Sequence, residues 1–342
     1  MEARVTESEF TETGKKKATL STVAVFPKGF FLENFAVRSD NSLLVTSLKT
    51  HELWYVPPAR REEHVEPTTL FTFDKSPMSL VESEPDVFYI FTTDGYATHA
   101  SSMYRIDLRT WRPGQEMHPK LILNFPSAVR ALNGSCLIGL RSILVADSFA
   151  SLIWRVDLSE DGQSANPSIW LKHYSMLYHP GEMKPEQPGV NGVRFSEKTS
   201  YLYYTATVLK LFMRVRVERE TLAPLGVPEY LGGGKMMDDF CLDEDAGVAY
   251  VTTHRDNTID RMSLEPDRSD ENETVAGSPF DEELVGPSSG AWGRAEGEYG
   301  RLAFFTTDGG TTSLPADGVL RPAKILRVEF EKVPNPTGRR QF

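Results

Sequence analysis

A short apolar segment recurs six times along the sequence, and this repeat leaves the chain very few folds to adopt. Each copy is a run of β-branched, aromatic and aliphatic residues that ends in Thr, Ser or Asp. The mean interval is 52 residues when the copies are aligned on Thr46, Thr92, Asp147, Thr205, Thr252 and Thr306. Self-similarity at such a period is typical of folds built from repeated supersecondary units. The sequence therefore predicts six equivalent units.

Each unit also carries a second segment in which apolar and polar residues alternate, which is the pattern of a half-buried β-strand. These segments are centred on Tyr55, Arg105, Arg155, Arg214, Arg261 and Arg327. Two further strand-like pieces, such as residues 32–37 and 68–73 in the first unit, bring each unit to four strands. Four-stranded units repeated every 40–50 residues or so are the blades of a β-propeller. We therefore predict an all-β fold, a six-bladed β-propeller.

The two ends of the repeat indicate how the ring closes. Residues 18–26 resemble a fourth strand that precedes the first complete unit, whereas the last unit ends at its third strand. The N-terminal strand is therefore expected to complete the last blade, which would also hide an exposed sheet edge. We predict a propeller over residues 18–332, with flexible tails at residues 1–17 and 333–342.

The composition of the chain limits the kinds of partner that it is expected to bind. The chain has 37 Lys and Arg against 48 Asp and Glu, a net charge of -11, whereas nucleic-acid binding usually requires a basic surface. No apolar run approaches the roughly 20 residues of a membrane span, and residues 1–17 lack the apolar core of a signal peptide. We expect a cytoplasmic protein that binds a small molecule, with no nucleic-acid partner; the oligomeric state is left open.

Polar residues begin the innermost strand in four of the six units. They are Glu33, Asn133, Asn191 and Asp238. Innermost strands of a propeller surround a central channel, so these side chains are expected to converge on one site. Two carboxylates and two amides are oxygen donors of the kind that a hard cation such as calcium binds.

Loops between the second and third strands open on the same face of the ring. They contribute a second set of candidates: His51, Asp94, Tyr96, His99, Ser148, Phe149, His254 and Asp308. Of these, His99 and His254 are the stronger acid–base candidates, because imidazole titrates near neutral pH. A histidine bonded to a loop carbonyl is the alternative interpretation for either.

The innermost-strand openings ENFAV, LNG, VNG and MDDFCLD, over residues 18–332, resemble those of the SMP-30/gluconolactonase/LRE-like six-bladed propellers. The resemblance implies Glu33, Asn191 and Asp238 as ligands of a divalent metal, with Asn133 contacting substrate. It also implies an Asp that acts as base in lactone hydrolysis. The family usually has Pro-Asp-Gly where this chain has Met237-Asp238-Asp239, so that either Asp238 or Asp239 is the matching carboxylate.

The segments ENFAVRSDNSLLVTSL, LIWRVDL and DDFCLDEDAGVAYVTTH are more similar to a fungal secondary-metabolite branch of that superfamily. That branch includes hetero-Diels-Alderases, which join a tropolone-type o-quinone methide to a humulene-type alkene in meroterpenoid biosynthesis. The resemblance implies a pericyclase that needs no cofactor.

In such a pericyclase Asp238, Asn191, His254 and His99 would be catalytic. Glu33, Asn133, Tyr96, Phe149, Ser148 and Asp239 would bind substrate.

Two other functions stay open. One is a lactone hydrolase that requires calcium or another divalent cation. The other is a propeller that only binds partners, which would have a filled channel and an exposed apolar patch. A wet cavity with convergent carboxylates would favour sugar lactones, whereas a largely apolar cavity would favour a terpenoid.

Overall fold

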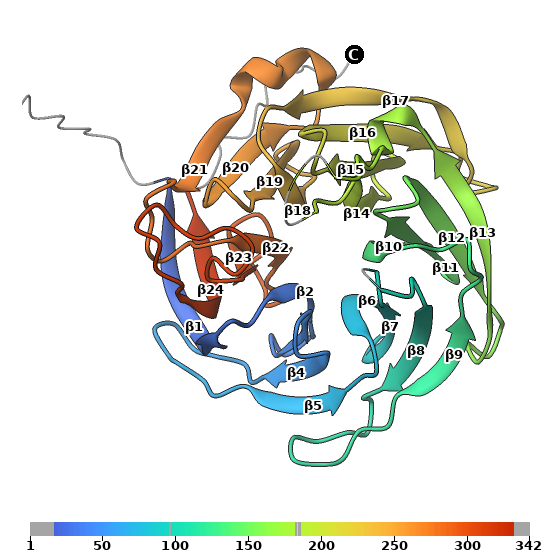
Figure 1. The fold of residues 1–342 in the computed structure, drawn as a ribbon, viewed down its shortest axis with the longest axis horizontal. Helices are drawn as coiled ribbons and strands as arrows, with labels where there is room; N and C mark the ends of the chain where they lie inside the picture. Colours follow the sequence, from blue (N-terminus) through green and yellow to red (C-terminus); the bar gives the residue numbers. More distant parts are fainter. Residues whose placement is uncertain (1–16, 96, 182, 184–185, 332–342) are drawn as a thin grey trace, which may run out of the picture.

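The computed structural model describes residues 17–95, 97–181, 183 and 186–331, and this part of the chain forms six four-stranded antiparallel sheets around a central axis (Figure 1). The predicted all-β, six-bladed propeller is thereby confirmed. The predicted tails fall outside the described residues, apart from Lys17, and the exact domain limits stay a prediction.

Within each blade the strands follow one another from the centre outwards. Blades one to three are β2 (Leu32–Val37), β3 (Leu43–Ser47), β4 (Glu52–Val56), β5 (Thr68–Thr72); β6 (Ser76–Glu84), β7 (Val87–Thr93), β8 (Ser101–Asp107), β9 (Lys120–Asn124); and β10 (Leu132–Gly139), β11 (Ser142–Asp147), β12 (Leu152–Leu158), β13 (Ala165–Lys172). Blades four to six are β14 (Val190–Ser196), β15 (Tyr201–Ala206), β16 (Leu211–Val217), β17 (Pro224–Gly233); β18 (Met237–Asp243), β19 (Val248–Thr253), β20 (Thr258–Ser263), β21 (Glu273–Gly277); and β22 (Pro287–Trp292), β23 (Leu302–Thr307), β24 (Pro322–Phe330), β1 (Ala18–Lys28).

The ring closes as the sequence predicts. Strand β1 pairs antiparallel with β24, from Ala18 opposite Phe330 to Lys28 opposite Pro322, and so forms the outer strand of blade six. In Figure 1 the two ends of the colour scale accordingly lie side by side.

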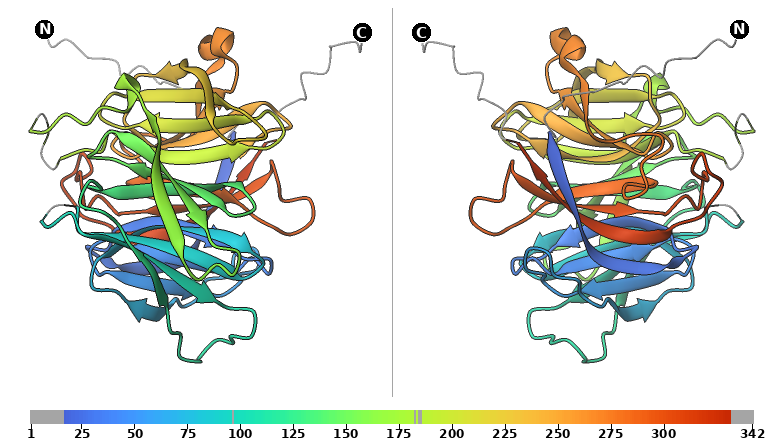
Figure 2. Two further views of the ribbon diagram at one scale, coloured as in Figure 1. Left: turned by 90° about the vertical axis from the view of Figure 1, so that its right-hand side faces the viewer. Right: turned by 90° about the vertical axis from the view of Figure 1, so that its left-hand side faces the viewer.

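Helix is confined to two short 3-10 turns in the described residues, η1 (Tyr174–Met176) and η2 (Pro266–Glu271). The second projects from the outer rim of blade five (Figure 2). No helix in the described chain has the length and apolar character needed to cross a membrane.

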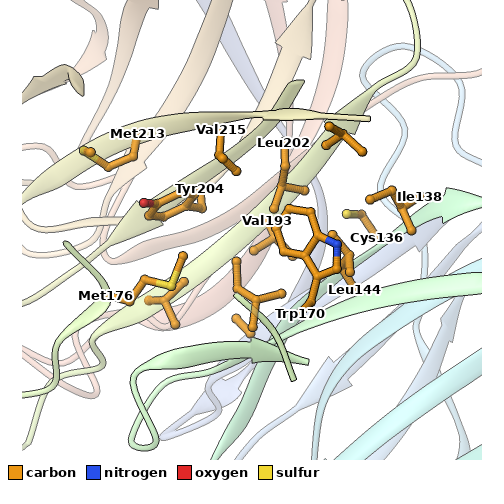
Figure 3. Close-up of a cluster of buried hydrophobic side chains, with 14 residues drawn as sticks. Cys136, Ile138, Leu144, Trp170, Met176, Val193, Leu202, Tyr204, Met213 and Val215 are labelled. Atoms are coloured by element: carbon orange, nitrogen blue, oxygen red, sulfur yellow. The ribbon is translucent and has the colours of Figure 1, made fainter. Parts of the chain in front are cut away.

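The hydrophobic core lies between neighbouring blades. Between blades three and four, for example, Leu144 and Trp170 face Leu202 and Tyr204, all of them buried (Figure 3). Each blade therefore buries both faces of its sheet, which explains the continuous apolar runs of the second strands. Arg214, on the third strand of blade four, reaches the next blade, where its guanidinium donates to Leu264 O.

A β-bulge near the start of the innermost strand is present in every blade. In five blades two residues face a single residue of the second strand: Glu33–Asn34, Asn133–Gly134, Asn191–Gly192, Asp238–Asp239 and Ser288–Ser289. In blade two the insertion is the single residue Met78. A bulge interrupts the alternation of a strand and redirects side chains. The first residue of such a bulge can therefore leave the blade interior and face the channel.

The Thr that marks the repeat in the sequence stands opposite the bulge in four blades. Its hydroxyl accepts the hydrogen bond of the bulged backbone N–H, as Thr252 Oγ1 does from Asp239 N at 3.0 Å and Thr46 Oγ1 does from Asn34 N at 3.0 Å. In blade three the equivalent residue is Ala146 rather than the predicted anchor Asp147. There Asp147 accepts from Ala131 N at 2.9 Å instead.

Side chains also donate to a backbone carbonyl of the next blade at all six junctions. These bonds run from Asn34 Nδ2 to Met78 O (2.8 Å), Ser79 Oγ to Asn133 O (2.6 Å), Ser148 Oγ to Val190 O (2.8 Å), Thr207 Oγ1 to Met237 O (2.7 Å), Thr252 Oγ1 to Ser288 O (3.0 Å) and Ser288 Oγ to Leu32 O (2.5 Å). The channel is thus enclosed by a continuous ring of hydrogen bonds.

Replacing Thr252 by Val should destabilise the protein by about 2–4 kcal/mol, because the buried groups Asp239 N and Ser288 O would each lose their partner. Chemical denaturation measures this change. Thr69→Val on the exposed outer strand β5 is the matched control and should stay within about 0.5 kcal/mol of the unmodified protein. Equal stability of the two variants would contradict the role given to the hydroxyl.

Candidate functional site

A cavity of about 250 Å³ lies at the end of the channel where the innermost strands begin. Residues from all six blades line it, including the loops that follow the second strands. The cavity therefore depends on closure of the whole ring.

Four polar side chains form the floor of this cavity: Glu33, Asn133, Asn191 and Asp238. Each is the first residue of its bulge, and each is at most 6 % exposed. Asn191 Nδ2 donates to Asp238 Oδ1 at 2.6 Å and to Thr207 Oγ1 at 2.9 Å. Asn133 Oδ1 is buried and has no hydrogen-bond partner among the described residues, so that it is free to accept from a ligand or to bind a cation.

The two carboxyl groups of the floor are held towards their protonated forms. Burial raises the pKa of Asp238 to about 7; the nearby charge of Asp239 adds to the rise, whereas His254 and the hydrogen bond from Asn191 oppose it. Burial also raises the pKa of Glu33 well above its usual value, and the charges of Asp238, Asp239 and Asp308 raise it further. Carboxyl groups that titrate near neutral pH can donate as well as accept a proton.

A histidine and an aspartate lie together at one side of the floor. His254 Nε2 is 3.2 Å from Asp308 Oδ2, and both side chains are almost fully buried. Burial lowers the pKa of His254, but the charges of Asp308 and Asp238 outweigh this effect and raise it overall. Conversely, burial raises the pKa of Asp308, but His254 and two backbone N–H donors outweigh burial and lower it. The pairing therefore favours the charged form of each group.

The walls above the floor are mainly apolar. Their apolar surface comes from Phe31, Leu48, Met78, Ala131, Leu132, Phe149 and Pro188, and polar residues such as Lys49, Glu186, Gln187 and Thr311 line the cavity between them. Phe149 stacks on Tyr178, with ring centroids 4.4 Å apart, and thereby connects the wall to the loop that follows η1. A ligand would meet a mainly apolar surface on its sides, with some polar groups, and the buried carboxyl and amide groups at one end.

Seven of the predicted site residues line the cavity: Glu33, Asn133, Asn191, Asp238, His254, Ser148 and Phe149. The hydroxyl of Ser148 is engaged with Val190 O, so that this residue supports the ring of blades as well. Tyr96 lies outside the described residues.

Asp239 and His99 do not line the cavity, which differs from the prediction. Asp239 is the second residue of its bulge; it forms an ion pair with Arg194 and accepts from Ser289 Oγ at 2.7 Å. Asp238 is therefore the carboxylate of this strand that faces the cavity. His99 stays in the β7–β8 loop, where its Nδ1 lies 3.0 Å from Arg130 O, the interaction that the alternative interpretation describes.

Sequence reasoning missed eight further polar lining residues: Lys49, Ser76, Thr93, Glu186, Gln187, Thr207, Thr311 and Thr312. Lys49 follows Thr46 by three residues and Thr311 follows Thr306 by five. Counting forward from the repeat anchor would have identified both as loop residues on the same face.

The chemical nature of the floor side chains indicates which kind of cation they could bind. The described residues contain no group of three or more His, Cys, Asp or Glu placed to hold a metal ion. The floor instead offers carboxylate and amide oxygens, and Asn133 Oδ1 is buried without a partner. An all-oxygen set with two carboxyl groups is compatible with calcium, which takes six to eight such ligands, waters included.

No protein-family model matches this sequence, and a search of curated protein sequences finds no match. Solved structures with a similar fold do exist. A luciferin-regenerating enzyme has 14% sequence identity and a TM-score of 0.63 over 91% of this chain and 95% of that chain. The calcium-binding protein regucalcin from Agrobacterium tumefaciens has 13% identity and a TM-score of 0.59 over 92% and 98%. A gluconolactonase from Xanthomonas campestris has 12% identity and a TM-score of 0.59 over 92% and 90%.

These neighbours are SMP-30/gluconolactonase/LRE-like six-bladed propellers, as the sequence resemblance predicts. At such low identity the similarity establishes the fold. Function has to be argued from the cavity itself.

Replacing Asp238 by Asn should stabilise the protein at high pH. Between pH 3.8 and about 7 the unfolded chain ionises at this position while the folded protein stays protonated, so the native state loses stability as the pH rises. The measurement compares the melting temperatures of Asp238→Asn and the unmodified protein, both in the presence of a chelator. The difference, variant minus unmodified, should increase between about pH 4 and pH 7 and then level off. In a chain of 342 residues each kcal/mol would appear as roughly 1–2 °C. A difference that shrinks with rising pH would contradict the raised pKa.

Proposed function

We propose that this protein is an enzyme of the hetero-Diels-Alderase type, which binds an apolar substrate in the central cavity and directs a cycloaddition. The observation that carries this proposal is the contrast between apolar walls and a polar floor. A sugar lactone bears hydroxyl groups around its ring, and most of them would lose their hydrogen bonds to water against such walls. A terpenoid alkene would instead gain from the contact.

A cycloaddition requires no nucleophile, only a pocket that holds the two reactants in a reactive orientation. Orientation of this kind can remove several kcal/mol from an activation barrier, up to about 7–11 kcal/mol in favourable cases. Phe31 and Phe149 would pack on the faces of an o-quinone methide and its alkene. The cavity is smaller than the roughly 300–1,000 Å³ of pockets that enclose drug-sized ligands, so the quinone-methide ring would occupy the floor and the terpene would extend towards the rim.

Hydrogen bonding at the floor would complement this positioning. The oxygen of an o-quinone methide gains negative charge as the new bonds form, and donors already directed at it stabilise that charge. The protonated carboxyl of Asp238 would be such a donor, and so would the ring of His254 when the nitrogen that faces the cavity carries a proton. The same acid would assist loss of water from a benzylic alcohol, which generates the quinone methide.

A second candidate, hydrolysis of a lactone, is favoured by a different observation, the convergence of buried oxygen donors on the floor. Glu33, Asn191 and Asp238 would hold a divalent cation, and Asn133 would complete the set or contact the substrate. A bound cation polarises a carbonyl oxygen and lowers the pKa of water. Asp238 would accept the proton of the attacking water.

The cyclisation is tested by supplying a benzylic-alcohol precursor of a tropolone-type quinone methide together with a humulene-type alkene. The protein should accelerate adduct formation and produce one stereoisomer, as measured by chiral chromatography. Phe149→Ala should lower the rate about tenfold or more, which corresponds to about 1.4 kcal/mol of barrier. Phe280→Ala is the matched control, because Phe280 is 78% exposed and lies outside the cavity lining. A racemic adduct formed at the uncatalysed rate would refute the proposal.

The hydrolase is tested by metal analysis of the purified protein and by a panel of lactones. It requires a stoichiometric cation, a melting temperature that falls on chelation and recovers with added calcium, and lactone turnover that Asp238→Asn abolishes. Asp161→Asn, a change at a solvent-exposed carboxylate, is the control. Full turnover by Asp238→Asn would exclude Asp238 as the base.

A further inference from the structure

Asp308 is held rigidly by the backbone around it. It follows strand β23, and its side chain is only 1% exposed. Asp308 Oδ1 accepts from Gly310 N at 2.7 Å and Oδ2 accepts from Thr312 N at 2.9 Å. Two backbone donors of this kind fix the carboxylate in position and favour its ionised form.

The ring of His254 is fixed from two directions. Its Nε2 lies 3.2 Å from Asp308 Oδ2, at ion-pair distance although off the line of a straight hydrogen bond. One face stacks on Phe31, with an interplanar angle of 17° and centroids 5.4 Å apart. Hydrogen bonds between such groups often become straighter only when a substrate is bound. With Nε2 directed at Asp308, Nδ1 is the nitrogen that His254 has available for the cavity, which the residue lines.

Space for this pair depends on Gly286, in the connection between blades five and six. A Cβ at this position would lie 1.8 Å from Asp308 Oδ1 and 3.4 Å from His254 Nε2. Gly286 also has φ +64°, a conformation that other residues rarely adopt. Asn257 Oδ1 accepts from Gly286 N at 2.9 Å and holds the connection in place.

We infer that Asp308 is a positioning residue that presents Nδ1 of His254 to the cavity, so that a proton exchanged between protein and ligand passes through this nitrogen. The inference rests on the proposed function in that it takes the central cavity as the active site. The group of the ligand that would exchange a proton with His254 is an ionisable hydroxyl or an oxygen that gains charge. The proton moves between that oxygen and Nδ1, and Asp308 balances the charge of the imidazolium that forms without itself taking the proton.

The test measures the ring nitrogens of His254 directly. In protein labelled with ¹⁵N-histidine, long-range ¹H–¹⁵N correlation at a pH where His254 is neutral should show the proton on Nε2, and Nδ1 should shift when the benzylic-alcohol precursor is added. His254→Asn assigns the signals. Asp308→Asn should remove the preference for the Nε2–H form. A proton on Nδ1 in the unmodified protein, or an unchanged spectrum in Asp308→Asn, would overturn the inference.

Gly286→Ala provides a second, independent variant, because it displaces Asp308 from His254 without removing an ionisable group. It should change the His254 signals in the same direction as Asp308→Asn. Gly318→Ala is the matched control: Gly318 has φ +71°, but a Cβ there would meet nothing within 4 Å. Gly318→Ala carries the backbone strain without the displacement and should leave the spectrum unchanged. If both glycine variants altered the His254 signals equally, strain rather than positioning would be the cause.

Activity then separates this inference from the proposed function. In the cyclisation assay Asp308→Asn should lower kcat about tenfold or more with less than a twofold change in KM. Unmodified kcat in a folded Asp308→Asn variant would overturn the positioning role while the proposed function stands. An Nε2–H signature that Asp308→Asn removes, in a protein that catalyses no cyclisation, would refute the proposed function and leave the His254–Asp308 arrangement intact.

Discussion

The bulge in each innermost strand, with the hydrogen bonds that satisfy it, is the constraint on which the rest of this structure depends. A bulge takes backbone groups out of the strand ladder, and buried groups of that kind are costly unless they find other partners. Here hydroxyl groups such as those of Thr46 and Thr252 accept from the bulged N–H, and side chains of the preceding blade donate to carbonyls of the next. The same bonds therefore permit polar residues at the channel, join the blades and close the cavity.

The presence or absence of a charged partner distinguishes acidic residues that support the structure from acidic residues that are candidates for function. Four acidic side chains are buried near the channel, and two of them have a cationic partner: Asp239 pairs with Arg194, and Asp308 pairs with His254. Within the described residues neither Glu33 nor Asp238 forms an ion pair, and burial raises the pKa of both. Unpaired buried carboxyl groups destabilise a fold, so their presence in a cavity is an indication of function.

In the propeller, different elements carry the polar groups of the cavity and form its walls. Innermost strands supply the polar floor, whereas the walls come largely from loops and strand ends, as with Leu48 and Phe149. Loops can change without disturbing the packing between blades, which is why one fold accommodates chemically different ligands. In this protein the floor offers carboxylate and amide oxygens, and the surface above it is mainly apolar. The two proposed functions differ in which part of the cavity determines the reaction.

The sequence alone determined the blade number, the strand positions and closure by β1, because these depend on apolar patterns that recur at a fixed period. It also identified Glu33, Asn133, Asn191 and Asp238, since equivalent places in a repeat meet at one axis. Only the tertiary structure decided between Asp238 and Asp239, because the bulge that turns one to the cavity and the other to Arg194 leaves no mark in the apolar pattern. The pairing of His254 with Asp308, and the position of His99 outside the cavity lining, were likewise decided by contacts between blades and loops far apart in the chain.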